Sequence, residues 1–73
     1  MIRYAVIIEK AADGGYGVYV PDLPGCVGMG GTKEEAVDNI AEAIRFHLEG
    51  MKEDGLPIPL ASSEAENIVL AIA

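Results

Sequence analysis

The sequence predicts a small α+β fold in which an antiparallel sheet packs against one long amphipathic helix. Three observations predict it: a glycine turn between two alternating apolar segments, a long helical periodicity in the second half, and an apolar run at the end. The expected order is strand, strand, strand, helix, strand. A length of 73 residues leaves room for one domain, and we expect residues 1–73 to form it.

A β-hairpin is expected at the start of the chain. Residues 2–9 mix β-branched and aromatic side chains, with apolar positions on both faces of an extended strand. Asp13, Gly14 and Gly15 follow, and glycine accepts the positive φ that tight hairpin turns require. Residues 16–20 then alternate, which places Tyr16 and Val18 on one face and predicts the second strand.

A stiff turn and a third strand are expected next. Residues 21–25 read Pro-Asp-Leu-Pro-Gly, and Pro24 with Gly25 suits the two central positions of a type II turn. Residues 26–31 are short, uncharged and rich in glycine. We interpret them as a strand that returns beside the second one.

Thr32 opens the clearest element of the sequence, a helix. The Thr32 hydroxyl can accept a hydrogen bond from the amide of Glu35, whose carboxylate can reach back to the amide of Thr32, as in a capping box. Gly55 is placed to end the helix, with prolines just beyond it. Apolar residues recur at helical spacing at Val37, Ile40, Ala41, Ile44, Leu48 and Met51.

The end of the chain suggests that the sheet has two apolar faces. Residues 60–67 are ambiguous, with a helical turn conceivable at Ser62 or Ser63, and residues 68–72 are expected to form a final strand. One helix covers only one face of a sheet. Ile7, Tyr19, Val69 and Ala71 are expected on the other face, so the pattern predicts another copy or a different protein as a partner.

Composition narrows the kind of partner. Hydrophobic residues make up 51 % of the chain and nine further residues are glycine, whereas the two classes together usually reach about 45–50 %. The net charge is −7 and the basic residues are scattered, which disfavours direct nucleic-acid binding. No apolar run approaches the roughly 20 residues of a membrane span, and the chain starts without a signal peptide's pattern. We therefore expect a cytoplasmic homo-oligomer.

Residue spacing supports none of three candidate chemical sites. Cys26 and His47 are residue types found in nucleophile and base pairs, but no third group or nucleophile-turn signature accompanies them. Glu9, Asp13 and Asp22 could supply carboxylates to a divalent metal, yet no spacing forces them together. No phosphate-binding loop precedes the helix. We expect no catalytic residues, no metal and no cofactor.

The chain resembles the HicB family of antitoxins. The residues that carry the resemblance are Tyr4 and the strand after it, Gly15, Tyr16, Val18, the run Pro21 to Cys26, Gly30, Thr32, Glu34, Glu35, Ala36, and Leu56 to Pro59. The resemblance spans nearly the whole chain. It implies a partial ribonuclease-H-like fold without catalytic activity, often assembled as a dimer or tetramer. It also implies that a small basic RNA-cleaving toxin of the HicA type is bound and neutralised.

The resemblance and the acidic charge together predict a partner-binding surface. We expect Ile7 and Tyr19 at its apolar centre and Glu9, Asp22 and Leu23 around them. Many members of the family continue into a C-terminal DNA-binding domain, which we do not expect here. The alternative is a self-associating, non-catalytic domain without a toxin partner, with a small ligand conceivable at the subunit boundary.

Overall fold

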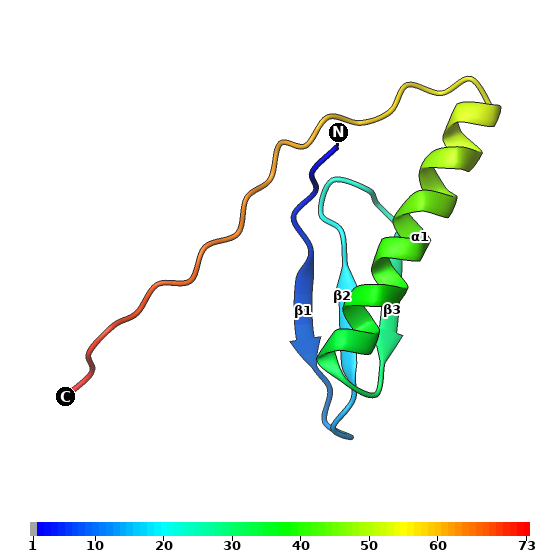
Figure 1. The fold of residues 1–73 in the computed structure, drawn as a ribbon. Coiled ribbons are helices and arrows are strands. Elements are labelled where there is room, and N and C mark those ends of the chain that lie inside the picture. The colour runs from blue at the N-terminus through cyan, green and yellow to red at the C-terminus, as the bar shows by residue number, and fades with distance from the viewer. Residues whose placement is uncertain (1) are drawn as a thin grey trace.

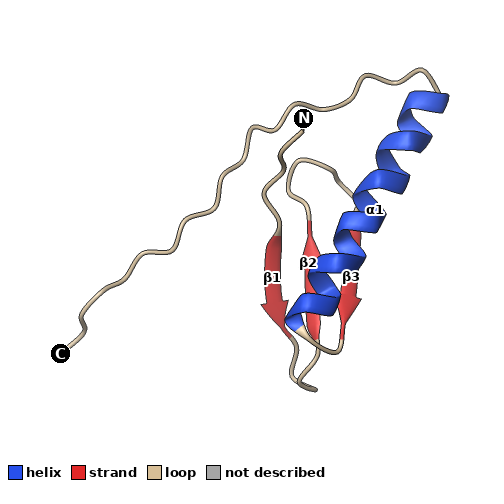
Figure 2. Ribbon diagram, viewed as in Figure 1, coloured by secondary structure: helices blue, strands red, loops and turns tan. Residues whose placement is uncertain are grey.

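The computed structural model describes residues 2–73 as a three-stranded sheet and one long helix. The strands are β1 (Ile7–Lys10), β2 (Tyr16–Tyr19) and β3 (Val27–Gly30), and the helix is α1 (Lys33–Glu53). Each strand pairs antiparallel with the next in the order β1-β2-β3, and α1 lies on one face (Figures 1 and 2). This confirms the predicted α+β class and the order of its first four elements.

Two glycines of β3 allow the helix to lie directly on the strand. A Cβ atom added to Gly30 would lie 2.6 Å from the backbone nitrogen of Ala36, and one on Gly28 would lie 3.5 Å from that of Ile40. A side chain at Gly30 would therefore displace α1, whereas a Cβ atom at Gly28 would just reach van der Waals contact with it. The helix consequently lies over β3 and β2 and leaves β1 at the side (Figure 2).

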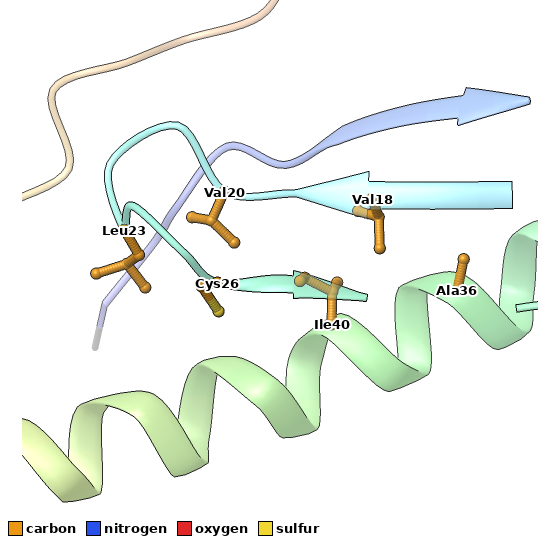
Figure 3. Close-up of a cluster of buried hydrophobic side chains, with 6 residues drawn as sticks. All are labelled: Val18, Val20, Leu23, Cys26, Ala36 and Ile40. Atoms are coloured by element: carbon orange, nitrogen blue, oxygen red, sulfur yellow. The ribbon is translucent and has the colours of Figure 1, made fainter. Parts of the chain in front are cut away.

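The buried core lies between α1, β2 and the loop that joins β2 to β3. It consists of Val18, Val20, Leu23, Cys26, Ala36 and Ile40 (Figure 3). Half-buried apolar side chains from β1 and from the second half of α1 surround it, among them Ile8 and Leu48. Six buried residues make a small core, consistent with the limited interior of a domain this size.

Both ends of α1 are capped by local hydrogen bonds. The Glu35 amide donates to Thr32 Oγ1 at 3.1 Å, as expected, but Glu35 Oε1 accepts from the amide of Gly31 rather than that of Thr32. At the other end Gly55 has a φ of 72°, and the amides of Gly55 and Leu56 donate to the carbonyls of Lys52 and Met51. This is a Schellman motif, and it confirms Gly55 as the stop signal.

The two predicted turns are also confirmed. Gly14 has a φ of 94° in the hairpin between β1 and β2. Gly25 has a φ of 84°, and the amide of Cys26 donates to the carbonyl of Leu23 at 3.0 Å, which closes the turn through Pro24. Positive φ values are costly for residues with a side chain, so glycine fixes both turns.

The segment after α1 differs from the prediction. Residues 56–73 contain no helix or strand; the chain passes beside Tyr4 and Asp22, to which it is hydrogen-bonded, and then runs in an extended path away from the sheet (Figure 1). The final strand expected over residues 68–72, and the helical turn considered at Ser62 or Ser63, are therefore wrong for this single chain. A β-branched run favours extended backbone, but a strand forms only beside a neighbour, and residues 68–72 have none within residues 2–73. Nor does the part of the chain described here contain a helix that is both long and apolar enough to cross a membrane.

Candidate interaction surface

The face of the sheet that is turned away from α1 carries a row of apolar side chains. The strand register sets Ile7 opposite Tyr19, and Tyr19 opposite Val27, so the three residues share one face and one row. Val18, the neighbour of Tyr19 in β2, is buried under α1, which fixes this row on the opposite side. We call this side of the sheet the outer face.

A second row on the outer face is more polar. Glu9 lies opposite Gly17, and Gly17 opposite Met29. Met29 and Val27 are 75 % and 65 % exposed, and Tyr19 is 41 % exposed. Gly17 stands between Glu9 and Met29 and contributes no side chain to this row. The outer face is thus an exposed apolar surface with a carboxylate at its β1 edge, a composition suited to protein contact.

Asp22 follows β2 and binds the segment that comes after the helix. Its Oδ2 accepts from the amides of Ser62 and Ser63 at 2.9 and 3.0 Å, and its Oδ1 accepts from both serine hydroxyls. The amide of Ser63 is the largest of the influences that lower the pKa of Asp22 to about 2. The stiff proline turn therefore presents a carboxylate that is already engaged within the chain.

The structure brings together only some of the residues expected in the partner-binding surface. Ile7, Glu9 and Tyr19 share the outer face, and Asp22 stands apart with its two serines. Leu23 is 0 % exposed and belongs to the core (Figure 3). The expectation that Leu23 lies at an exposed surface is wrong: its backbone is held between two turns, with its amide donating to the carbonyl of Val20 and its carbonyl accepting from the amide of Cys26, and its side chain is buried.

Val27 and Met29 were missed by the sequence reasoning. From the sequence, their segment is predicted as a strand, but its side chains are assigned to neither face. Alternation was the available signal: Gly28 and Gly30 occupy the face under α1, so Val27 and Met29 must occupy the other one.

Cys26 and His47 line the same surface groove, of about 430 Å³, between β3 and the second half of α1. Cys26 is only 5 % exposed, and burial raises the pKa of its thiol. Burial thus disfavours the thiolate, which is the nucleophilic form of cysteine. Cys26 acts in this structure as a small apolar core residue.

The acids considered as metal ligands do not meet. Within residues 2–73 no group of three His, Cys, Asp or Glu side chains is close enough to hold a metal ion. Asp13 instead accepts a hydrogen bond from the amide of Gly15 in its own turn, and Asp22 accepts from the serines. The Asp13 carboxylate thus stabilises its own turn, and the Asp22 carboxylate holds a segment distant in sequence.

A comparison with protein families decides where the chain belongs. The sequence profile described as "HicB_like antitoxin of bacterial toxin-antitoxin system" matches residues 4–71. The chain belongs to this HicB-like antitoxin family.

Individual relatives support the assignment to the HicB-like family. The chain is 49 % identical over 63 residues to a UPF0150 protein of Thermoplasma acidophilum, covering 86 % of this chain and 91 % of that protein. The fold is similar to the crystal structure of the N-terminal domain of Burkholderia pseudomallei antitoxin HicB, with a TM-score of 0.74 and 36 % identity, covering 81 % of this chain and 69 % of that one. The fold is also similar to a chain of the HicA3 and HicB3 toxin-antitoxin complex, with a TM-score of 0.69 and 31 % identity. This match covers 84 % of this chain and 70 % of that one.

Proposed function

We propose that this protein is an antitoxin that binds and neutralises a small basic RNA-cleaving toxin of the HicA type. Membership of the HicB-like family supports the antitoxin role, and the solved HicA3 and HicB3 complex supports a toxin of this kind as the partner. The net charge of −7 suits a basic protein. Neutralisation would occur in the cytoplasm, where the toxin meets its RNA.

We assign the contact to the outer face. The observation that carries this assignment is the row of Ile7, Tyr19 and Val27, which α1 leaves uncovered and which Glu9 borders. An apolar centre with an acidic edge would hold a basic partner by burial at the centre and by charge at the rim. Tyr19 stands in the middle of the row, and central aromatic residues contribute a large share of binding energy.

We further propose that the protein acts by binding rather than by catalysis. Its one thiol is buried in the neutral form, and Asp22 and Asp13 are engaged with backbone amides. Blocking the surface of a toxin needs no reacting group. Shape and charge on the outer face are sufficient for it.

Growth rescue tests the proposal directly. The HicA-type toxin of the same genome is expressed with the wild-type chain, with Tyr19→Ala, or with Phe46→Ala as a matched control. Phe46 is an aromatic residue, 81 % exposed on α1, which packs on the face of the sheet opposite Tyr19; it borders the apolar row only at Val27, with which it lines a groove. We expect rescue by the wild type and by Phe46→Ala, and weaker rescue by Tyr19→Ala.

The outcomes separate the surface from the function. Circular dichroism must first show that each variant keeps its helix. Equal rescue by all three chains would remove the outer face from the mechanism. Toxicity that the wild-type chain does not relieve would overturn the antitoxin proposal and leave the self-associating, non-catalytic domain as the better description.

A further inference from the structure

The last ten residues form an exposed apolar segment without a partner. We call residues 64–73 the C-terminal arm. Its side chains Ile68, Val69, Leu70 and Ile72 are between 71 % and 94 % exposed. The arm is extended: its first residues, up to Asn67, pass beside the start of the chain's own sheet, and the rest leads away from it (Figure 1). Four large aliphatic side chains in water on one short segment are unfavourable, so a surface that covers them is expected.

The root of the arm is fixed to the domain. The Tyr4 hydroxyl donates to the carbonyl of Pro59 at 2.5 Å, and Asp22 binds Ser62 and Ser63 through four hydrogen bonds. The arm therefore starts from a defined point beside the beginning of β1. It contains neither glycine nor proline, and alternating positions place Ile68, Leu70 and Ile72 on one side when it is extended.

The sheet offers two edges to an additional strand, and β1 is the more open one. At the β3 edge, the side-chain amide of Asn39 in α1 donates to the carbonyl of Met29 at 2.7 Å, so α1 occupies a backbone group there. β1 has β2 as its single neighbouring strand within residues 2–73. An unpaired strand edge is a template for pairing with another chain.

The side of β1 that faces α1 is apolar and incompletely covered. Val6, just before β1, and Ile8 are half-buried there, and a groove of about 580 Å³ lies between them and the start of the chain's own arm, where Ala65 and Asn67 also line it. A second groove, of about 290 Å³, is lined by Tyr4 and by Ile44 and Leu48 of α1. An additional strand beside β1 would send every second side chain toward these grooves, where an aliphatic row fits.

Charge also favours this edge. The arm begins with Glu64 and Glu66, whereas Arg3 precedes β1 and Lys10 ends it. A basic residue therefore stands at each end of β1. Glu64 and Glu66 would lie near one of them whether the arm paired parallel or antiparallel to β1. Beyond Glu66 the arm carries no charged side chain, so no unpaired charge would be buried by its pairing.

We infer that two copies of this chain exchange their arms, with the arm of each pairing as a strand beside β1 of the other. Ile68, Leu70 and Ile72 then fill the grooves next to Val6 and Ile8, and Val69 and Ala71 extend the outer face beyond Ile7. The contact is reciprocal, as two-fold symmetry requires. It concerns assembly and does not depend on toxin binding, so either proposal can fail without the other.

Sedimentation of matched variants provides the first test. Analytical ultracentrifugation at micromolar concentration should give the mass of two chains for the wild type and of one chain for Leu70→Asp, because the variant buries a charge at the pairing surface. Phe46→Ser removes another exposed apolar side chain, outside the arm, and should remain a dimer. A wild-type monomer, a dimeric Leu70→Asp, or a monomeric Phe46→Ser would each overturn the inference.

The second test uses the wild-type chain and does not rely on any variant's folding. Isotope-filtered NMR of an equal mixture of carbon-13-labelled and unlabelled chains detects contacts between copies only. Contacts from the methyl groups of Leu70 to those of Val6 or Ile8 are expected in the filtered spectrum. If these contacts occurred only within one chain, the arm would fold back on its own sheet, and exchange between copies would be ruled out.

Discussion

Gly30 and Ala36 fix how closely the helix approaches the sheet. A Cβ atom on Gly30 would lie 2.6 Å from the backbone nitrogen of Ala36 and 2.7 Å from Cβ of Glu35, and Ala36 is itself fully buried. Because backbone atoms of a capped helix cannot move aside individually, any side chain at position 30 would require α1 to shift. The first turn of α1 is thereby held against the end of β3.

We therefore expect Gly30→Ala to destabilise the fold by about 1–3 kcal/mol, the usual cost of overpacking. Chemical denaturation followed by circular dichroism measures the loss. Gly17→Ala is the matched control, because Gly17 lies in the next strand with nothing within 4 Å of an added Cβ. An equal loss in both variants would mean that general strand effects, not contact with Ala36, cause it.

The N-terminal cap of α1 gives a second stability prediction. Thr32→Ala removes the oxygen that accepts from the amide of Glu35, so we expect about 1 kcal/mol less stability. Thr32→Ser keeps the hydroxyl and should lose much less. An unchanged denaturation midpoint for Thr32→Ala would show that the Glu35 carboxylate at Gly31 caps the helix without help.

Asp22 predicts how the root of the arm responds to acid. Hydrogen bonds from Ser63 and Ser62 lower the pKa of its carboxyl from 3.8 to about 2. A group whose folded-state pKa is depressed stabilises above its ordinary pKa and loses that contribution as the pH falls through the folded value. Ser62 and Ser63 should therefore stay bound to Asp22 at neutral pH and be released as the pH falls from 3.8 to about 2.

NMR titration of the Ser62 and Ser63 amides checks this acid response. Both amide shifts should change with a midpoint near the lowered pKa, and Asp22→Asn should abolish the transition. Asp38→Asn alters an exposed carboxylate on α1 instead and should leave the transition of the Ser62 and Ser63 amide shifts unchanged. A midpoint at the ordinary value of 3.8 would show that the serines do not hold the ionised carboxylate in solution.

Local signals in the sequence predicted most of the fold. Gly14, Gly25 and Gly55 each adopt positive φ at the turn or stop that was expected of them, and Thr32 caps the helix. These features depend on neighbours within a few residues, which a single sequence displays. The final strand depends on a partner strand far along the chain or in another copy, which the sequence of one chain does not display.

The candidate surface was predictable only in part for a similar reason. Period-two alternation correctly placed Ile7 and Tyr19 on one face, and the register confirms that they are opposite each other. Leu23 and Asp22 lie in a loop, where no period fixes the direction of a side chain. Their outcomes were set by the type II turn and by Ser62 and Ser63, about forty residues away in sequence.

Toxin binding kinetics should separate the centre of the outer face from its edge. Tyr19→Ala removes the middle of the apolar row, so we expect the dissociation rate to rise by about tenfold or more. Glu9→Gln removes an exposed charge at the edge, so it should mainly slow association and flatten its dependence on salt. Surface plasmon resonance at several salt concentrations measures both rates. Glu9 is a cleaner probe than Asp22, whose substitution would also release Ser62 and Ser63.

The comparison between the two variants is decisive because charge and burial act at different stages of binding. Long-range attraction steers the encounter, whereas the packed centre sets how long the complex lasts. Glu34→Gln, which alters an exposed acid on α1, controls for net charge and should slow association less than Glu9→Gln. If Glu34→Gln had the larger effect, the toxin would approach the helix side. If Tyr19→Ala left dissociation unchanged, the apolar row would not be the contact, whatever the effect of the acids.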